Sequence, residues 1–161
     1  MKLMKNTARL FVAIAAMAVP LAGFSAEQRK GGDALMEPVK SVLDHYLAIQ
    51  KDLAKDSIKA VDEHAAAISK AVKADEMKML SPDVATQAET LAKAQEIKAA
   101  REAFRPLSAS LVKYLADNKA GVGTYHEAYC PMVKASWLQT GKAIKNPYMG
   151  KQMLSCGELK N

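Results

Sequence analysis

The sequence predicts an all-α fold, an up-and-down four-helix bundle that carries an irregular C-terminal tail. Three observations lead to this prediction. Four stretches of the chain place apolar residues at helical spacing, the loops between them are short, and the inner positions are rich in alanine, which lets helices pack closely. We therefore expect one helical domain over residues 34–161, with the bundle at about 34–118 and the tail at about 121–161 packed on it.

The first two helices are predicted from their apolar stripes. Pro38 suits the first turn of a helix, and that helix should run to about Ala54 on the apolar residues Val39, Val42, Leu43, Tyr46, Leu47 and Leu53. Asp56 or Ser57 can cap the second helix. Its inner stripe consists of Ile58, Val61, Ala65, Ile68 and Val72.

The third helix has a strong start signal. Ser81-Pro82-Asp83 combines a capping hydroxyl, a proline at the first helical position and an acid near the positive end of the helix dipole. This helix should fade near Ala94, and the fourth should run from about Ile97 to Asp117. Pro106 falls inside the fourth helix and should kink it, because its ring removes one backbone hydrogen bond.

The tail differs from the bundle in composition. After a hinge at Gly121-Val122-Gly123, the residue types Tyr, Pro, Gly, Cys and Met replace Ala and Lys. Helical periodicity is lost except at about 134–139. A tail of about 38 residues is too short to form a core of its own. We therefore expect it to pack over the bundle through the aromatic residues Tyr129, Trp137 and Tyr148.

The first 25 residues predict export. Their positive end consists of Lys2, Lys5 and Arg9. The apolar run at residues 10–19 is about half as long as the roughly 20 residues that span a bilayer, and its flanks are those of a cleavable secretory signal. Cleavage near Ser25 or Ala26 would release a periplasmic protein with a flexible lead-in at 26–33 and no stable membrane anchor. The alternative is a permanent N-terminal anchor.

Charge and composition exclude several classes of function. Removal of the signal lowers the net charge from +6 to about +3, too weak and too mixed with acids to favour nucleic acid. The chain has no Gly-rich phosphate loop, no acidic cluster for hard cations and no C-x-x-C-H motif for haem. Catalysis is not expected either. Ser108 has no evident histidine and acid partners, and His126 with Cys130 would be a poor nucleophile pair in a flexible, oxidising setting.

Both cysteines lie in the tail and have methionine neighbours. Cys130 is followed closely by Met132, and Met153 precedes Cys156. Thiolate and thioether sulfur are soft ligands that prefer Cu(I) or similar ions. These four residues would suit a copper(I) site, and His126, four residues before Cys130, could add a nitrogen ligand if its segment turns inward.

The same cysteines could instead form a structural disulfide. Two cysteines separated by 25 residues usually pair in an oxidising compartment. Closing that loop would stabilise the fold by about 3 to 3.5 kcal/mol in the chain-entropy model. The spacing does not decide between Cys130–Cys156 as a disulfide and as a metal site.

Several motifs resemble one known family. They are Tyr129-Cys130-Pro131-Met132, Asn146-Pro147-Tyr148-Met149-Gly150, Met153-Leu154-Ser155-Cys156-Gly157 and the helical Arg101-x-x-Phe104-x-x-Leu107-Ser108. The family is a bacterial periplasmic domain of unknown function, found alone and fused to heavy-metal (copper/silver) efflux adaptor proteins. This chain departs from it at Met149, where Phe is usual, and in a short segment at 133–136.

The resemblance implies an association with metal efflux and a metal site at Cys130, Met132, Met153 and Cys156. We therefore expect a non-enzymatic periplasmic protein that binds a soft metal ion, copper first. It would buffer the ion or deliver it to an efflux adaptor or a metalloprotein assembly system. The alternative is an interaction module that is stapled by a Cys130–Cys156 disulfide.

The two remaining histidines are predicted to be structural. His64 shares a helix face with Val61, Ala65 and Ile68, which is typical of a hydrogen-bonded histidine at the edge of a core. His45 lies beside an apolar stripe and is predicted to be a boundary residue.

Overall fold

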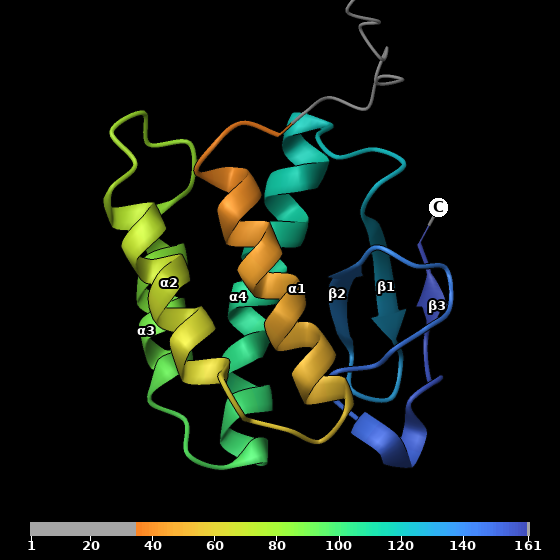
Figure 1. Ribbon diagram of the computed structural model, residues 1–161. Helices are drawn as coiled ribbons and strands as arrows, with labels where there is room; N and C mark the ends of the chain where they lie inside the picture. Colours follow the sequence, from red (N-terminus) through yellow and green to blue (C-terminus); the bar gives the residue numbers. More distant parts are fainter. Residues whose placement is uncertain (1–34, 161) are drawn as a thin grey trace, which may run out of the picture. The chain divides into compact units, whose positions relative to one another are not determined.

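Four helices form the larger part of the protein. The structure is a computed structural model that describes residues 35–160, so the predicted export signal and lead-in lie outside the described residues. The helices are α1 (Val39–Ala54), α2 (Val61–Lys73), α3 (Pro82–Ala92) and α4 (Ile97–Asn118) (Figure 1). They follow one another around a shared core, because α1 packs on α2, α2 on α3 and α3 on α4.

The helix boundaries confirm most of the predicted starts and correct one. Ser81 caps α3 as expected, since its Oγ accepts a hydrogen bond from the Asp83 N–H at 3.3 Å. α4 begins at Ile97 and continues through Pro106. The predicted cap of α2 is wrong. That helix starts after Ala60, and Asp56 lies in the preceding loop, where its carboxylate binds Arg101 instead.

The prediction of an all-α fold is wrong, because the tail contains a three-stranded antiparallel sheet. Its strands are β1 (His126–Cys130), β2 (Ala135–Gln139) and β3 (Glu158–Leu159), in the order β2-β1-β3. The stretch at about 134–139, predicted to retain helical character, is β2. A short 3-10 helix, η1 (Gly150–Met153), lies between β2 and β3.

The physical reason for this error is the burial of β2. Four of its five residues are buried, so the strand lacks the apolar–polar alternation that marks a strand with one solvated face. β3 has two residues, too few for any periodicity. The Trp and Tyr residues of the tail are frequent in strands, but composition alone does not fix a strand.

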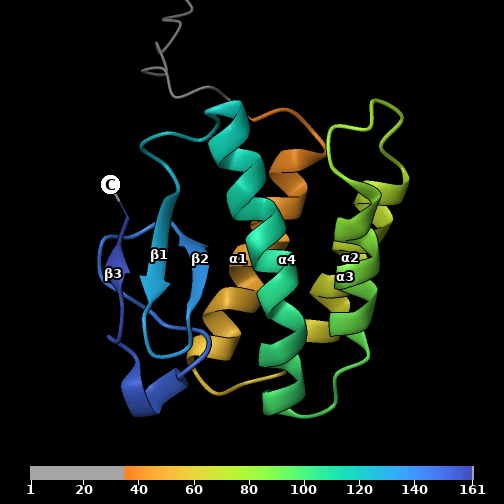
Figure 2. The same ribbon diagram turned by 180° about the vertical axis from the view of Figure 1, so that it is seen from behind.

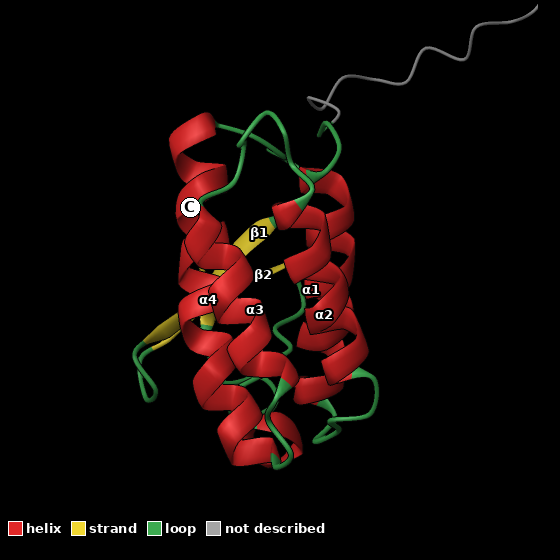
Figure 3. Ribbon diagram, turned by 90° about the vertical axis from the view of Figure 1, so that its left-hand side faces the viewer, coloured by secondary structure: helices red, strands yellow, loops and turns green. Residues whose placement is uncertain are grey.

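The sheet packs on α4 and α1 through β2. Figure 2 shows α4 between the sheet and α3, and in Figure 3 the strands lie behind the helices, on the far side from α2 and α3. Trp137, Leu138 and Tyr148 are buried in the same core as the helices. The described part of the chain is therefore one compact unit with a shared core.

A buried hydrogen-bond network fixes the sheet to the helices. Tyr46 Oη on α1 lies 2.6 Å from Ser108 Oγ on α4 and accepts the Leu138 N–H of β2 at 3.0 Å. The Ser136 carbonyl accepts hydrogen bonds from Ser108 Oγ at 2.9 Å and from Tyr148 Oη at 2.8 Å. Burial raises the pKa of Tyr148 to about 12 and raises that of Tyr46 further, so both phenols stay neutral.

Within residues 35–160, no helix is both long enough and apolar enough to cross a bilayer.

Candidate functional site

The two cysteines lie side by side at one end of the sheet. Their Sγ atoms are 3.1 Å apart, although 26 positions separate them in the sequence. Cys130 is the buried last residue of β1, and Cys156 is half-buried in the turn that follows η1. Both are free thiols. The fold thus assembles a dithiol from two distant segments.

The strand register explains this placement. β3 pairs with β1 so that Ala128 faces Leu159 and Tyr129 faces Glu158. Continuing this register by one residue places Gly157 opposite Cys130, with Cys156 next to it. The turn before β3 is closed by a hydrogen bond from the Cys156 N–H to the Met153 carbonyl at 3.0 Å.

Gly157 is required for this close approach. Its φ is +136°, and a Cβ atom there would lie 2.8 Å from the Trp137 ring and 2.9 Å from the Tyr129 carbonyl oxygen. Real Cβ atoms do not occur at such distances from their neighbours. The glycine after Cys156 therefore lets the segment pass beneath Trp137 and reach Cys130.

Asn146 holds the cysteine segment in place. Its side chain is fully buried and donates a hydrogen bond to the Cys156 carbonyl at 2.7 Å. The other side-chain atom, Oδ1, accepts from the N–H groups of Tyr148 at 2.8 Å and Met149 at 3.1 Å. Its own N–H donates to the Leu154 carbonyl at 2.8 Å. Sequence analysis noted the Asn-Pro-Tyr motif but not this role.

The two thiols differ in acidity. Burial raises the pKa of Cys130, but hydrogen bonds from the Cys156 thiol and from the Val133 and Met132 N–H groups outweigh it, so the pKa falls below its usual value. Donation of its proton to Cys130 raises the pKa of Cys156, and burial adds to this effect. The first proton therefore leaves Cys130, and Cys156 stabilises the resulting thiolate.

The predicted thioether ligands are close to this pair in sequence. Met132 lies in the β1–β2 turn with 61% of its surface exposed, and Met153 is the half-buried last residue of η1. No group of three His, Cys, Asp or Glu side chains gathers anywhere in the described part of the chain. Among the described residues, no His, Asp or Glu side chain therefore joins the two thiols, and the methionine sulfurs stay the predicted further ligands.

His126 does not join the thiols. It is the first residue of β1, opposite Gln139, whereas Cys130 is the last. At about 3.3 Å per residue, four residues separate the two by roughly 13 Å. His126 instead lines a separate pocket of about 310 Å³ with Tyr125 and Val122.

A cluster of hydrogen bonds around Arg101, which sequence analysis missed, anchors η1 to the helices. Arg101 on α4 donates to Asp56 Oδ1 at 2.6 Å, to the Leu53 carbonyl at 2.9 Å and to the Pro147 carbonyl at 2.8 Å. The Asp56 carboxylate also accepts the Lys151 N–H at 3.1 Å. The hydrogen bond and charge of Arg101 lower the pKa of Asp56. Nothing in the sequence indicated that Asp56, first read as a helix cap, would pair with Arg101.

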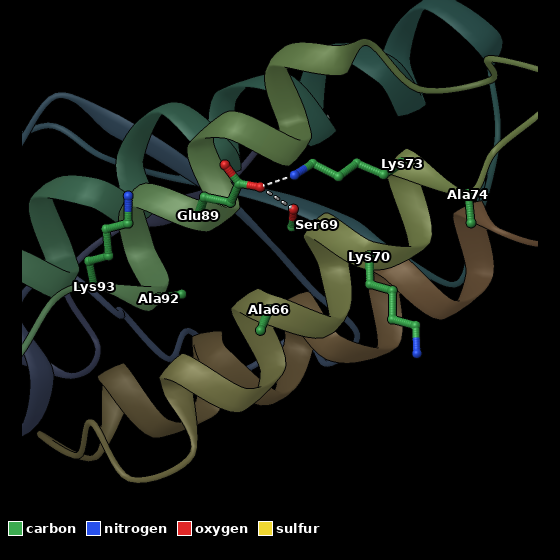
Figure 4. Close-up of a pocket in the computed structure, with 8 residues that line it drawn as sticks. All are labelled: Ala66, Ser69, Lys70, Lys73, Ala74, Glu89, Ala92 and Lys93. Atoms are coloured by element: carbon green, nitrogen blue, oxygen red, sulfur yellow. Dashed lines mark hydrogen bonds and ion pairs between the residues drawn. The ribbon is translucent and has the colours of Figure 1, made fainter.

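A groove on the other side of the bundle is separate from the thiols. It has a volume of about 580 Å³ and lies between α2 and α3, with Ala66 and Ala92 among its lining residues. Figure 4 shows Ser69 and Lys73 pointing toward Glu89, which accepts a hydrogen bond from Ser69 Oγ at 2.9 Å and forms an ion pair with Lys73. The groove is lined by no cysteine, methionine or histidine, so it does not extend the candidate site.

Comparison with known proteins assigns the chain to a family. No curated protein and no solved structure matches it. A family profile matches residues 42–122, from α1 to the end of α4, and the thiol pair lies beyond the matched segment. Because the match covers half of the sequence, this protein belongs to the family described as "Protein of unknown function (DUF3347)".

Proposed function

We propose that the protein binds a soft metal ion, Cu(I) first, at Cys130 and Cys156. The observation that carries the proposal is the free dithiol, with its two sulfur atoms 3.1 Å apart. Two thiolates favour soft ions such as Cu(I), and Ag(I) and Hg(II) share this preference. The ion is the cargo, which the protein buffers or delivers.

The dithiol geometry requires a small adjustment to hold an ion. With metal–sulfur bonds of about 2.3 Å, two sulfur ligands of one ion lie roughly 3.7 to 4.6 Å apart, from tetrahedral to linear geometry. The present separation of 3.1 Å must therefore grow by about 0.6 to 1.5 Å. Cys156 can supply this movement, because it lies in a half-exposed turn and not in a strand.

Further ligands would come from methionine. Met153 precedes Cys156 by three residues across the turn, and Met132 follows Cys130 by two. Thioether sulfur is neutral and soft, so it supports Cu(I) without adding charge. We include Met153 as the first candidate and Met132, which is largely exposed, as the second.

The place of action and the partner are part of the same proposal. The N-terminal sequence supports export to the periplasm. The tail motifs, which resemble those of domains fused to heavy-metal efflux adaptors, support delivery to an adaptor or to a metalloprotein assembly system. After export and removal of the signal, the remaining chain would still contain all of residues 35–160.

A competition titration tests the metal site. The reduced protein without residues 1–25 is titrated with Cu(I) against a chromophoric chelator, and free thiols are counted before and after reduction. We expect one ion per chain, and we expect Cys130→Ser and Cys156→Ser each to abolish tight binding. Met153→Leu should weaken binding, whereas the matched control Met77→Leu, in the exposed α2–α3 loop, should leave it unchanged. Equal affinity for wild type and Cys130→Ser would overturn the proposal.

A second candidate function, an interaction module with a structural Cys130–Cys156 disulfide, is favoured by the same short distance between the two sulfur atoms. A disulfide bond is about 2.05 Å long, so free thiols at 3.1 Å need little movement to form one. The bond would stabilise the fold by about 3.5 kcal/mol in the chain-entropy model and would leave a non-catalytic interaction module. Thiol counting separates the two. If protein purified from the periplasm has no free thiols and mild reductant does not release any, the structural disulfide is favoured.

A further inference from the structure

A second pair of potential metal ligands lies between α1 and α2, away from the sheet. His45 on α1 and His64 on α2 approach each other with their Nδ1 atoms 3.0 Å apart. Both side chains are half-buried. The two helices pack directly on one another, and Figure 3 shows them side by side. The contact joins residues 19 positions apart and was not foreseen, because each histidine was read separately as structural.

The two rings meet edge to edge. Their centres are 5.2 Å apart and their planes are inclined by 45°, while the nitrogen atoms are 3.0 Å apart. The nitrogens therefore lie between the ring centres and face each other. In neutral imidazoles, one of these nitrogens donates a proton and the other accepts it. Only one of the two Nδ1 atoms therefore has a free lone pair in this contact, because the other carries the hydrogen.

This separation fits two ligands of one metal ion. Zinc–nitrogen bonds are about 2.0 to 2.1 Å long, so nitrogens 3.0 Å apart would subtend roughly 95° at the ion. That value lies near the right angle between neighbouring ligands in square-planar and octahedral sites. A widening of about 0.3 Å would give the tetrahedral angle. To bind the ion, the ring that carries its hydrogen on Nδ1 would take the tautomer with the hydrogen on Nε2. Both rings would also turn, so that their Nδ1 lone pairs converge on the ion instead of facing each other.

The ligand type indicates the class of ion. Imidazole nitrogen suits Zn²⁺, Cu²⁺ and Ni²⁺, in contrast to the soft ions that prefer thiolates. Because the described residues contain no group of three His, Cys, Asp or Glu side chains, the remaining positions would be filled by water. The half-exposure of both rings leaves room for that water.

We propose that His45 and His64 form a binding site for a borderline divalent ion of the Zn²⁺, Cu²⁺ or Ni²⁺ class, which bridges α1 and α2. The site is independent of the dithiol. It uses different ligands on different elements. Binding would link the first two helices and stabilise them against separation.

Calorimetric titration with Ni²⁺ at neutral pH tests this site, with untagged Cys130→Ser/Cys156→Ser protein, because thiolates would also bind the ion. For this titration the histidine variants are made in the same background. His45→Gln and His64→Gln should each weaken binding by at least about tenfold, since loss of an outer-shell partner alone costs roughly 10- to 100-fold. The double variant should be no weaker than either single variant, because one ligand alone does not hold the ion. His126→Gln is the matched control. It removes the third histidine of the chain and should leave binding unchanged.

Two further measurements make the result decisive. Cu(I) titration of His45→Gln should match wild type, so failure of this site and failure of the thiol site are distinguishable. Electron paramagnetic resonance of the Cu²⁺-loaded Cys130→Ser/Cys156→Ser protein, which has no thiol to reduce Cu²⁺, should show coupling to two imidazole nitrogens. Ni²⁺ binding that survives in His45→Gln, or a Cu²⁺ spectrum with no imidazole coupling, would overturn the proposal.

Discussion

At the residue scale, Gly150 is the position where a side chain is least tolerated, because it would collide with the Asp56–Arg101 ion pair. A Cβ atom on Gly150 would lie 1.8 Å from Asp56 Oδ1 and 2.2 Å from an Arg101 guanidinium nitrogen. The φ of Gly150, +58°, is also in the left-handed region. The Asp56–Arg101 pair and the start of η1 can therefore coexist only when residue 150 has no side chain.

Replacement of Gly150 by alanine should destabilise the protein by about 2 to 4 kcal/mol, since it adds backbone strain and displaces an ion pair. Urea denaturation measures this change. Gly123→Ala isolates the strain, because the φ there is +81° but nothing lies within 4 Å of an added Cβ; it should cost about 1 kcal/mol. Gly141→Ala, with open space and an ordinary φ, should cost almost nothing. Equal losses of unfolding free energy in all three glycine variants would contradict a steric clash at Gly150.

The hydroxyl of Tyr46 should contribute measurably to stability. Tyr46→Phe removes the acceptor of the Leu138 N–H and a partner of Ser108, and leaves both groups buried without it. The expected cost is about 1 to 3 kcal/mol in the free energy of unfolding. Tyr114→Phe serves as control, because the Tyr114 hydroxyl has no hydrogen bond within residues 35–160; its effect should stay within about 0.5 kcal/mol. If Tyr46→Phe leaves the free energy of unfolding unchanged, water replaces the hydrogen bonds of the Tyr46 hydroxyl.

Asp56 should make part of the stability depend on acid. Arg101 lowers its pKa in the folded state, so its contribution is complete above the unfolded value of about 3.9 and is lost as the pH falls through the folded pKa. Asp56→Asn should therefore lower the urea midpoint at neutral pH, and the gap to wild type should close below about pH 4. Asp44→Asn, which removes an exposed ion pair with Lys40, should change the midpoint little. A gap that persists at low pH would exclude this account.

The reactivity of Cys156 should be suppressed by its neighbour. Its pKa is raised by the proton it shares with Cys130, and reaction requires the thiolate. Cys130→Ser removes the sulfur that accepts this proton, so Cys156 should react with a thiol reagent measurably faster than in wild type. Stopped-flow absorbance measures the rate, with urea-unfolded protein as the reference for free access. A slower reaction in Cys130→Ser would contradict the assigned direction of proton donation.

At the element scale, the helices were largely predictable and the sheet was not. α3 and α4 have local start signals, such as Ser81-Pro82, that act within one turn. The start of α2 was misplaced because Asp56, a plausible cap by type, is bound by Arg101, 45 residues away. Strand pairing depends on contacts between distant residues, and the buried β2 hides its alternation. Cysteine chemistry predicted that Cys130 and Cys156 would meet, but no sequence pattern placed His126 at the opposite end of β1.

The helices should depend on the sheet for a closed core. α1 and α4 lose their cover of Trp137, Leu138 and Tyr148 if residues 121–161 are deleted. We expect the remaining helical segment to bind a hydrophobic dye and to lose cooperative thermal unfolding, while keeping helical circular dichroism. Full-length protein is the control. A sharp transition close to that of the full chain would show that the helices form a complete core alone.

At the scale of the whole molecule, the family match and the proposed chemistry occupy different parts of the chain. Residues 42–122 carry the family match and contain the histidine pair, whereas the dithiol follows in the sheet. The groove between α2 and α3 lies on the opposite side of the bundle from that sheet (Figures 1 and 4). Ion binding at the thiols would therefore leave the α2–α3 side unobstructed.

The order of these parts along the chain has a consequence for synthesis. A polypeptide emerges N-terminus first, so all four helices are available before β1, and Cys130 appears before Cys156. Until β2 arrives, the side of α1 and α4 that carries Tyr46 and Phe104 has no cover. The dithiol forms only when β3 and its preceding turn have closed on β1. The proposed two-sulfur site is thus complete only in a molecule that has finished folding, and a partly synthesised chain offers at most one of its two thiols in place.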